Sequence, residues 1–527
     1  NQTAVALFPQ DADAHNNLGN ALKEFGRLDE AEASYTQAIA LKPDFAEAHN
    51  NLGVMQQELV RLDEAEASYT QAIALKPEFA EAYSNLGITL RELGRLDEAE
   101  ASYTQAIALK PDYAKAHSNL GVTLQELGRL DEAEASYTQA IALKPDFAEA
   151  HSNLGRMLQG LGRLDEAKAS CAQAIALKPD FAEAHSNLGN ALKELGRLDE
   201  AEASFMQAIA WKPDYAEAHN NLGITLKELG RLDEAEASFT QVIALKPDFA
   251  EAHSNLGNAL KELGRLDEAE ASYTQAIALK PDFAAAYFKL GQIFYANGDI
   301  DRAIEIHQKA YEIDSGMQEN ELLLNVLRSK ITQGTTAQNI NTANKRDGEL
   351  GLNSNAIIKD RIVEAELISY LYEINSSTLD EAPGPRYGNG RCSPDYNLFN
   401  NDRSIIKIVK NDLTKIMKLA VKSEIYVFDS FFNIYGAGAG IPPHQHFNKL
   451  DKDKYHNLER QKYSLVYYLS VGDQDCSEPG ILKLYGPEQD ILPCEGMIVI
   501  FPASRMHSAI YGGQTDRVMI GVNFYSL

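Results

Sequence analysis

The sequence predicts a multidomain protein in which an all-α superhelix of repeats precedes a mainly β domain. The first observation is a proline that returns every 34 residues through the first two-thirds of the 527-residue chain. The second is a change after residue 314 to short runs of β-branched and aromatic residues broken by Gly, Pro, Asn and Asp. We therefore expect repeats at 1–314, a capping helix and polar linker at 315–355, and the β domain at 356–527.

The chain is strongly acidic. It carries 49 Lys and Arg residues against 76 Asp and Glu residues, which gives a formal net charge of −27. This charge would repel phosphates, so neither nucleic acid nor an anionic membrane is expected as the main partner. The sequence contains no run of about 18 apolar residues, which argues against a transmembrane helix. Four cysteines without a CxxC pair, and the lack of a signal-peptide pattern, favour a reducing cytoplasm.

Each repeat predicts two antiparallel helices. In 247–280, which reads PDFAEAHSNLGNALKELGRLDEAEASYTQAIALK, apolar and small residues recur at helical spacing on both sides of a turn around Gly264. Gly257 and Ala269 are small enough to let the two helices approach closely, and the proline of the next repeat ends the second helix. The repeats begin at Pro9, Pro43, Pro77, Pro111, Pro145, Pro179, Pro213, Pro247 and Pro281. This period and pattern resemble the tetratricopeptide repeat, whose helix pairs stack into a superhelical solenoid with a concave inner surface.

Asparagine returns at one equivalent position in eight consecutive first helices: Asn17, Asn51, Asn85, Asn119, Asn153, Asn187, Asn221 and Asn255. The surrounding run AHSNLGNALKELG resembles the repeats of O-linked N-acetylglucosamine transferase, and this resemblance implies a ladder that holds an extended peptide backbone. A carboxamide offers both the donor and the acceptor that a peptide group needs. The alternative is that near-identical repeats duplicate an asparagine that serves a neighbouring helix. On the first interpretation the substrate-binding residues are Asn119, Asn153, Asn187, Asn221 and Asn255.

Seven histidines occupy another equivalent position of the repeat: His15, His49, His117, His151, His185, His219 and His253. A ladder of metal-binding imidazoles is one interpretation. Tyr83 and Tyr287 replace histidine in two repeats, which instead indicates a half-buried ring used for packing. We expect the packing role.

The region after the repeats predicts a different fold. The run ENELLLNVLRSKI at 319–331 predicts a capping helix, and the polar segment 332–355 predicts a mobile linker or a long loop. An amphipathic helix is expected at 404–423. The strands are expected in IYVFDSFFNIYG, YSLVYYLSV, GILKLYG, GMIVIFPA and RVMIGVNFY. Several short strands separated by turn signals indicate a small barrel or sandwich.

Three histidines of this β region have the spacing of a metal site. His444 and His446 are two residues apart, and side chains at i and i+2 of a strand point to the same face, so both imidazoles can meet one ion. His507 follows a strongly apolar strand, and Arg517 opens the last strand ten residues later.

These features resemble the Fe(II)/2-oxoglutarate-dependent oxygenases over roughly 425–527. That family has a double-stranded β-helix, a jelly-roll or cupin-like fold, with an HxD/E motif, a distal histidine and a basic residue beyond it. The resemblance implies that His444, His446 and His507 are the catalytic ligands of Fe(II), with 2-oxoglutarate and dioxygen as cosubstrates. It also implies that Arg517 pairs with the C5 carboxylate of 2-oxoglutarate, a role for which a bidentate arginine is well shaped. Tyr435 or Tyr467 would assist.

The sequence departs from the family pattern in two places. His446 stands where the family has a carboxylate, which leaves three alternatives: a three-histidine site, a site completed by Asp451 or Asp453, and a two-histidine site as in aspartyl/asparaginyl β-hydroxylases. A barrel without a metal is the fourth interpretation. In the last strand the usual RxS is replaced by Arg, Val and Met at 517–519. Imidazole ligands alone admit several metals, and the resemblance favours iron over zinc.

The favoured interpretation is a cytoplasmic Fe(II)/2-oxoglutarate-dependent dioxygenase that hydroxylates a protein or peptide recruited by the groove of the repeats. One rival is an interaction scaffold with a non-catalytic metal-binding barrel. Another is an oxygenase that acts on a small molecule or glycan, with the repeats used only for assembly. A homo-oligomer is compatible with all three.

Overall fold

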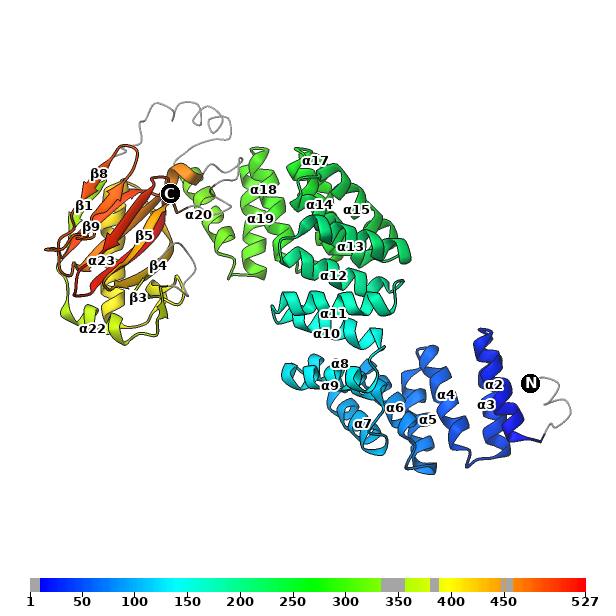
Figure 1. The fold of residues 1–527 in the computed structure, drawn as a ribbon. Helices are drawn as coiled ribbons and strands as arrows, with labels where there is room; N and C mark the ends of the chain where they lie inside the picture. The colour runs from blue at the N-terminus through cyan, green and yellow to red at the C-terminus, as the bar shows by residue number, and fades with distance from the viewer. Residues whose placement is uncertain (1–9, 333–355, 380–387, 447–450, 452–457) are drawn as a thin grey trace. The chain divides into compact units, whose positions relative to one another are not determined.

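The computed structural model describes residues 10–332, 356–379, 388–446, 451 and 458–527 (Figure 1). The chain divides into two compact units, Asn1–Ala259 and Leu260–Leu527. The expected linker at 332–355 lies, apart from its first residue, outside the described residues. In the part of the chain that is described, no helix is long and apolar enough to cross a membrane.

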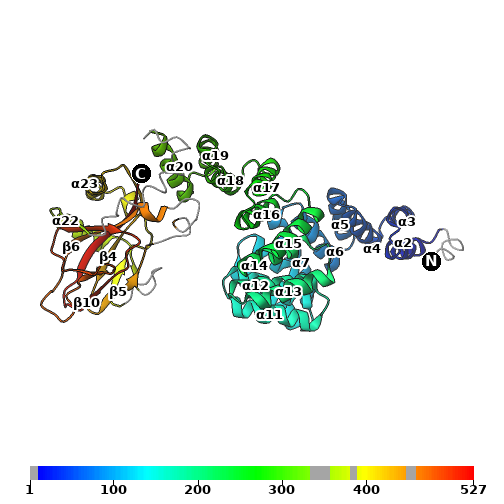
Figure 2. The ribbon, with the colours of Figure 1, turned by 90° about the horizontal axis from the view of Figure 1, so that it is seen from above.

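Antiparallel helix pairs form the first unit, and successive pairs lie side by side in chain order (Figures 1 and 2). The helices of the repeats are α2 (Ala12–Glu24), α3 (Leu28–Leu41), α4 (Ala46–Glu58), α5 (Leu62–Leu75), α6 (Ala80–Glu92), α7 (Leu96–Leu109), α8 (Ala114–Glu126), α9 (Leu130–Leu143), α10 (Ala148–Gly160), α11 (Leu164–Leu177), α12 (Ala182–Glu194), α13 (Leu198–Trp211), α14 (Ala216–Glu228), α15 (Leu232–Leu245), α16 (Ala250–Glu262), α17 (Leu266–Leu279), α18 (Ala284–Ala296) and α19 (Ile300–Ile313). The predicted repeat of two helices is confirmed.

A glycine against an aromatic ring sets the spacing within a helix pair. Tyr69 of α5 is fully buried, and a Cβ atom on Gly53 of α4 would lie 2.7 Å from its ring. Any larger residue at this position would push the helices apart. Gly94, in the turn between α6 and α7, has a φ of 75°, which glycine adopts without the steric penalty of other residues.

Arginine and glutamate side chains join neighbouring repeats at the turns. Arg61 pairs with Glu64 of its own repeat at 2.5 Å and with Glu32 of the preceding repeat at 2.7 Å. Arg95 makes the same two contacts with Glu98 and Glu66. Exposed pairs contribute about 0–1 kcal/mol each. Because these pairs recur from repeat to repeat, some of the many glutamates of the chain belong to a regular network of ion pairs with the turn arginines.

The repeat histidines bond within their own repeats. The Nε2 atom of His49 lies 3.2 Å from the carbonyl oxygen of Pro43, six residues earlier. Equivalent contacts occur at His117, His151, His185, His219 and His253. This geometry fits packing rings and gives no support to a ladder of metal ions.

The second unit contains α17–α20 and a domain of two antiparallel sheets. One sheet has the strand order β1-β9-β6-β11-β4-β3-β2 and the other has the order β5-β10-β7-β8. The expected helices appear as α20 (Gln318–Thr332) and α23 (Ser404–Val421), with a further helix α22 (Ala365–Glu373). The strands are β1 (Ile357–Asp360), β2 (Ser377–Thr378), β3 (Gly390–Cys392), β4 (Ile425–Tyr435), β5 (Ala439–His444), β6 (Lys462–Ser470), β7 (Leu482–Leu484), β8 (Gln489–Ile491), β9 (Met497–Pro502), β10 (His507–Tyr511) and β11 (Arg517–Ser526).

The larger sheet is buried on both faces. On one face, Leu413 of α23 packs in a cluster with Phe432 and Ile520 of the sheet. On the other face, Tyr468 packs in a second cluster with Leu482 of the smaller sheet. Because successive strand residues point to opposite faces, each central strand contributes to both clusters. The space between the two sheets is therefore the place for an interior site.

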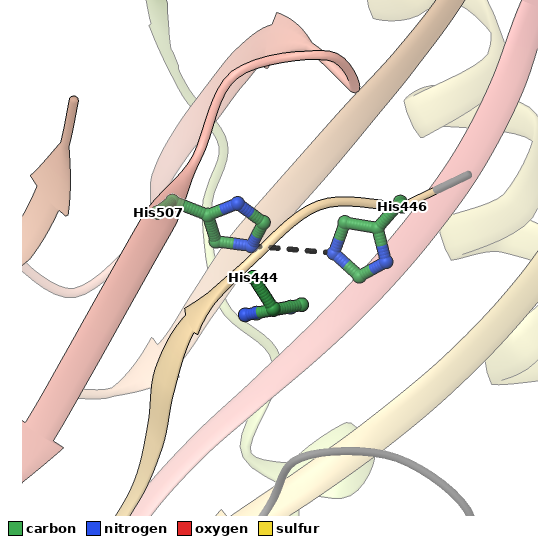
Figure 3. Close-up of side chains that lie close together, drawn as sticks. All are labelled: His444, His446 and His507. Atoms are coloured by element: carbon green, nitrogen blue, oxygen red, sulfur yellow. Dashed lines mark hydrogen bonds between the residues drawn. The ribbon is translucent and has the colours of Figure 1, made fainter. Parts of the chain in front are cut away.

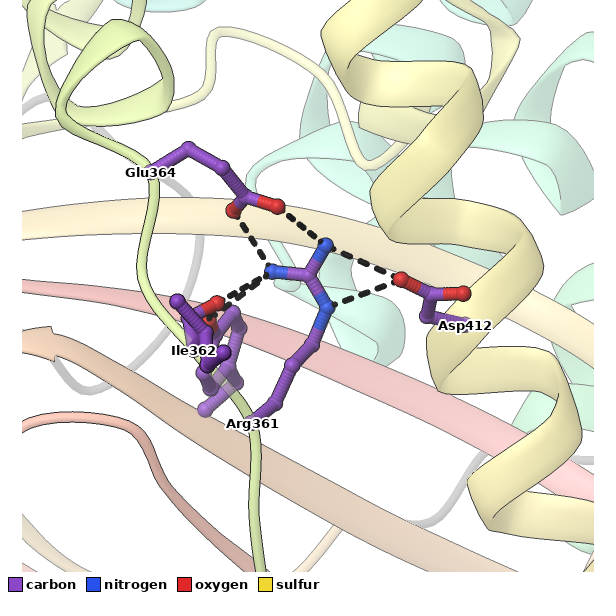
Figure 4. Close-up of polar contacts among 5 residues, drawn as sticks. Arg361, Ile362, Glu364 and Asp412 are labelled. Carbon is purple, nitrogen blue, oxygen red and sulfur yellow. Dashed lines mark hydrogen bonds and ion pairs between the residues drawn. The ribbon is translucent and has the colours of Figure 1, made fainter.

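A polar cluster ties α23 to the helix-covered face (Figure 4). The guanidinium of Arg361 donates to the Glu364 carboxylate at 2.7 Å, to Asp412 of α23 at 3.1 Å and to the Tyr467 hydroxyl at 3.0 Å. The Arg361 side chain is only 8% exposed. Hydrogen bonding to Arg361 holds the pKa of Glu364 below its usual value.

We expect Arg361→Met to lower the free energy of unfolding by about 2 kcal/mol, because hydrogen bonds to charged groups are worth about 1.5–3 kcal/mol. The measurement is chemical denaturation of the full-length protein. The control Arg302→Met breaks an exposed pair with Asp299 and should cost less than about 1 kcal/mol. Since the folded-state pKa of Glu364 is lowered, its share of the stability is present above the unfolded pKa and is lost as the pH falls through the folded value. Equal losses in both variants would contradict this structural role.

Candidate metal centre

Pairing of β5 with β10 brings two of the three expected ligands together. His444, the last residue of β5, lies opposite His507, the first residue of β10. His446 follows two residues later, and its backbone N–H donates to the carbonyl oxygen of Ala503 at 3.3 Å. One ring nitrogen of each of the three histidines lies within 4.8 Å of one ring nitrogen of each of the other two (Figure 3).

The separation of two of these nitrogens suits a shared metal ion. The Nε2 atoms of His446 and His507 are 3.2 Å apart. Two nitrogens that are each about 2.1 Å from one ion, at an angle of about 90–110°, would lie about 3.0–3.4 Å apart. The separation of this pair therefore fits a first-row transition metal.

Backbone carbonyls orient two of the rings. The Nδ1 atom of His444 lies 3.0 Å from the carbonyl oxygen of Pro442, and Nδ1 of His507 lies 3.2 Å from that of Arg505. An N–H at Nδ1 that donates to a carbonyl leaves the Nε2 lone pair for a metal. Burial, with a smaller contribution from His444, lowers the pKa of His507 to about 3. His507 is therefore neutral at pH 7, as a metal ligand must be.

Asp451, one of the alternative third ligands, bonds to other residues and is not part of the histidine cluster. Its carboxylate accepts hydrogen bonds from the Lys462 ammonium at 2.8 Å and from the Tyr525 hydroxyl at 2.6 Å. Among the described residues, the metal-competent group contains the three histidines without a carboxylate. The alternative based on Asp451 is thus not supported by its position, and Asp453 lies outside the described residues.

An interior cavity of about 40 Å³ adjoins His446 and His507 between the two sheets. Tyr435 lines it, as expected for a residue near a cosubstrate. Asn433 lines it as well, and its Oδ1 atom is buried without a hydrogen-bond partner among the described residues. Asn433 is not among the site residues that the sequence predicted. Its position two residues before Tyr435, on the same face of one strand, is the signal that could have identified it.

Tyr467 lies on the opposite face of the sheet from this cavity. Its hydroxyl donates to the carbonyl oxygen of Ile362 at 3.1 Å and accepts from Arg361 at 3.0 Å. Its neighbour Tyr468 lines the cavity instead. The expectation that Tyr467 contacts a cosubstrate is therefore corrected: alternation along β6 turns its ring toward the helices.

Arg517 is buried beside Tyr435, a residue of the cavity lining. The two residues pair in register, and Arg517 is 1% exposed and donates to the backbone carbonyls of Val471, Pro479 and Gly480. Its guanidinium carbon lies 4.7 Å from the centre of the Tyr511 ring. In the described part of the chain no carboxylate pairs with it. Burial lowers its pKa, yet an arginine remains protonated in proteins.

The asparagine ladder is half-buried, and several of its members bond to the preceding repeat. The Nδ2 atom of Asn187 donates to Ser152 at 3.0 Å, and that of Asn255 donates to Asn220 at 3.0 Å. Asn221 donates to Asn190 at 3.0 Å. At these positions the asparagine does bond to a neighbouring helix, as the alternative interpretation of the ladder expects. A carboxamide has one oxygen and two N–H groups, so each of these side chains uses one N–H group in this contact. Asn119 and Asn153 are also half-buried.

Comparisons with known proteins assign the helical part of the chain. The family model of the cilia and flagella-associated protein 70 C-terminal domain matches residues 2–220. Models of the TPR repeat match 225–264 and 257–298, and tetratricopeptide repeat models match 204–237 and 284–316. No curated protein gives a significant match.

Three solved structures illustrate the similarity to known proteins. YrrB, described as a TPR protein with an unusual peptide-binding site, is 26% identical and aligns 95% of its chain with 35% of this one, at a TM-score of 0.29. A thermophilic TPR protein of Thermus thermophilus is 29% identical over 98% of its chain and 34% of this one, at a TM-score of 0.31. The Cut9–Hcn1 structure of the APC/C is 15% identical. It aligns 80% of its chain with 62% of this one, at a TM-score of 0.42. The matching family models show that the helical part of this chain is an array of tetratricopeptide repeats.

Proposed function

We propose that the sheet domain is an Fe(II)/2-oxoglutarate-dependent oxygenase with a double-stranded β-helix fold, and that the repeats recruit a protein or peptide substrate. The main support is the cluster of His444, His446 and His507 at the end of two paired strands, beside a cavity lined by residues of two antiparallel sheets. Tetratricopeptide repeats generally serve protein–protein interaction, which supports a protein partner.

The histidines of this chain would hold the metal through three neutral imidazoles. Three protein ligands leave three positions for 2-oxoglutarate and dioxygen, the arrangement that non-haem iron oxygenases use. Bound iron with 2-oxoglutarate would supply the oxidising chemistry. His446, in place of a carboxylate, makes the site one unit more positive. The carbonyls of Pro442 and Arg505 would keep the Nδ1–H tautomers in place.

Arg517 is the candidate anchor for the cosubstrate. A buried guanidinium with only carbonyl partners can exchange them for a carboxylate, which adds a charge-assisted bidentate contact. The present cavity of about 40 Å³ holds about three waters at roughly 10–15 Å³ each. Cosubstrate binding therefore requires the cavity to widen toward Arg517. Asn433 and Tyr435 line the cavity and would offer polar contacts.

The second candidate is a tetratricopeptide scaffold whose sheet domain binds a metal without catalysis. Two observations favour the scaffold. The guanidinium of Arg517 already bonds to backbone carbonyls, and the cavity is small, so the protein's own atoms fill the space that a cosubstrate would need. An anaerobic titration of the iron-loaded protein with 2-oxoglutarate separates the two. A charge-transfer absorption band supports the oxygenase, and its absence supports the scaffold.

The metal assignment predicts that His444→Ala and His507→Ala each abolish stoichiometric Fe(II) binding, because each removes one of three ligands. His446→Asp should retain the metal, since an aspartate restores the ligand set of the wider family. Metal content after anaerobic loading and desalting is the measurement. His253→Ala, in the repeats, is the matched control and should load fully. One equivalent of iron in the His507→Ala protein would refute the site.

The cosubstrate assignment predicts a raised dissociation constant for 2-oxoglutarate in Arg517→Ala, with iron binding nearly unchanged. Losing one partner of a buried charge pair costs about 2–5 kcal/mol, which is a weakening of about thirtyfold or more. Titration of the anaerobic iron-loaded protein measures it. Tyr435→Phe should weaken binding and Tyr467→Phe should not, because only Tyr435 lines the cavity. Unchanged affinity in Arg517→Ala would move the anchor to another residue.

The ladder predicts that one asparagine is dispensable and that four together are not. A net hydrogen bond is worth about 0.5–1.5 kcal/mol, so several must be removed to affect binding strongly. The quadruple alanine variant of Asn153, Asn187, Asn221 and Asn255 should keep its iron and its uncoupled 2-oxoglutarate turnover. It should lose most hydroxylation of protein substrates, as measured by mass spectrometry of treated lysate proteins.

The matched control for this prediction replaces four exposed threonines of second helices by alanine: Thr70, Thr104, Thr138 and Thr240. This variant should hydroxylate protein at the wild-type level. Full activity of the asparagine variant would refute the ladder and leave the repeats as an assembly device.

A further inference from the structure

The cavity beside the histidines contains a polar side chain with an unmatched acceptor. Asn433 of β4 lines this cavity together with His446 and His507, and it is only 3% exposed. Its Oδ1 atom is buried and accepts no hydrogen bond from any described residue. The residues that pair with Asn433 in the sheet are Cys392 on β3 and Met519 on β11, whose sulfur atoms are weak hydrogen-bonding groups. A buried oxygen in these surroundings costs stability.

A second asparagine of the same cavity shows the pattern that a structural role produces. Asn523 of β11 also lines the cavity and is 4% exposed. Its carboxamide oxygen accepts a hydrogen bond from the Ser464 hydroxyl at 2.7 Å, and its Nδ2 atom donates to the Asp429 carboxylate at 2.7 Å. Both polar atoms of the Asn523 side chain thus have partners in the protein, whereas the oxygen of Asn433 has none among the described residues. The contrast indicates that Asn433 serves a molecule that enters the cavity.

The other walls of the cavity limit what this molecule can be. Phe431, Leu482 and Met519 are among the apolar residues that line it. Apolar walls with one precisely placed polar atom suit an uncharged group that carries an N–H or O–H donor. An ammonium group would lose its water without gaining a counter-charge, because the described residues that line the cavity include no Asp or Glu.

The proposed cosubstrate does not supply such a donor. At neutral pH, 2-oxoglutarate has two carboxylates and a keto group, and these groups only accept hydrogen bonds. The N–H groups of Asn433 are able to donate to it, but the oxygen of Asn433 is not able to bond to it. The donor for this oxygen therefore belongs to the second organic molecule of the reaction, the one that is oxidised.

We infer that Asn433 is a substrate-binding residue, whose carboxamide oxygen accepts a hydrogen bond from an uncharged N–H or O–H of the substrate group beside the metal. The inference rests on the proposed function and names the class of group that the site oxidises. In a protein substrate this class contains the amide and hydroxyl side chains. Proline, leucine and valine side chains, which have no donor, fall outside it.

The experiment measures how many hydroxyl groups form on lysate proteins for each succinate that the full-length iron-loaded protein releases. A coupled turnover converts 2-oxoglutarate, dioxygen and a substrate C–H bond into succinate, carbon dioxide and a C–OH bond, so complete coupling gives a ratio of one. Because it is a ratio, this readout does not depend on a change in cosubstrate affinity. Asn433→Leu, which keeps the volume and loses the oxygen, should lower the ratio about tenfold. Asn433→Asp, which keeps an oxygen at the same position, should stay near the wild-type ratio.

Thermal unfolding without added substrate separates a binding role from a structural one. Asn433→Leu should raise the melting temperature, because an apolar group replaces a buried oxygen that has no partner. The matched control Asn523→Leu should lower it, because Ser464 and Asp429 lose their partner. A raised melting temperature also shows that the Asn433→Leu protein is folded when its coupling is measured.

Four results would overturn the inference. A melting temperature that falls in Asn433→Leu as far as in Asn523→Leu would give Asn433 a structural role. A wild-type ratio in Asn433→Leu would show that its oxygen serves only water. Equal losses of coupling in Asn433→Asp and Asn433→Leu would assign the contact to the N–H groups. Hydroxylation by the wild-type protein mainly at side chains without a donor, such as proline, would exclude the substrate class.

Failure of the proposed function looks different from these results. The wild-type protein itself would then form no succinate, and the inference would fall with the function on which it rests. A wild-type protein that forms succinate and hydroxylates proteins, beside an Asn433→Leu protein that is more stable and poorly coupled, is the expected result.

Discussion

Strands β5 and β10 pair antiparallel with His444 opposite His507, and the positions of two of the three clustered histidines follow from this register. A shift of one residue would turn one imidazole out of the interior, since strand side chains alternate between faces. His446 lies beyond the end of β5, so it needs separate support, which it finds through Ala503 and Lys462. Two candidate ligands are thus positioned by sheet pairing and the third by backbone hydrogen bonds.

The repeats are likewise held together by local contacts, which form within a helix pair or between adjacent repeats. In most repeats a glycine of the first helix faces an aromatic ring of the second, and several turn arginines bond to the preceding repeat. Such an array has no single core, and its surface is generated by repetition. One asparagine per repeat therefore becomes a line of half-buried carboxamides, several of which the neighbouring repeat holds in a defined orientation.

Much of this organisation could be predicted from sequence, because it depends on periodicity. The 34-residue repeat predicted the helix pairs, and the i, i+2 spacing predicted that His444 and His446 would meet. When a strand is buried on both faces, the sequence does not show which face each side chain points to. Tyr467 and Tyr468 are adjacent tyrosines in a strand that is apolar on both faces, so composition does not tell which one faces the cavity. The partner of Asp451 depends on a pairing between distant segments, which has no local signature.

Formation of succinate from 2-oxoglutarate under ¹⁸O₂, by the full-length iron-loaded protein, tests the central claim most directly. The reaction consumes one dioxygen and releases carbon dioxide, and one oxygen atom enters the new carboxylate. The account predicts succinate that carries one ¹⁸O atom, in amounts that exceed the protein concentration and fall to background after chelation of the metal. Protein that holds a full equivalent of iron yet forms no labelled succinate would contradict the oxygenase assignment and leave a metal-binding repeat scaffold.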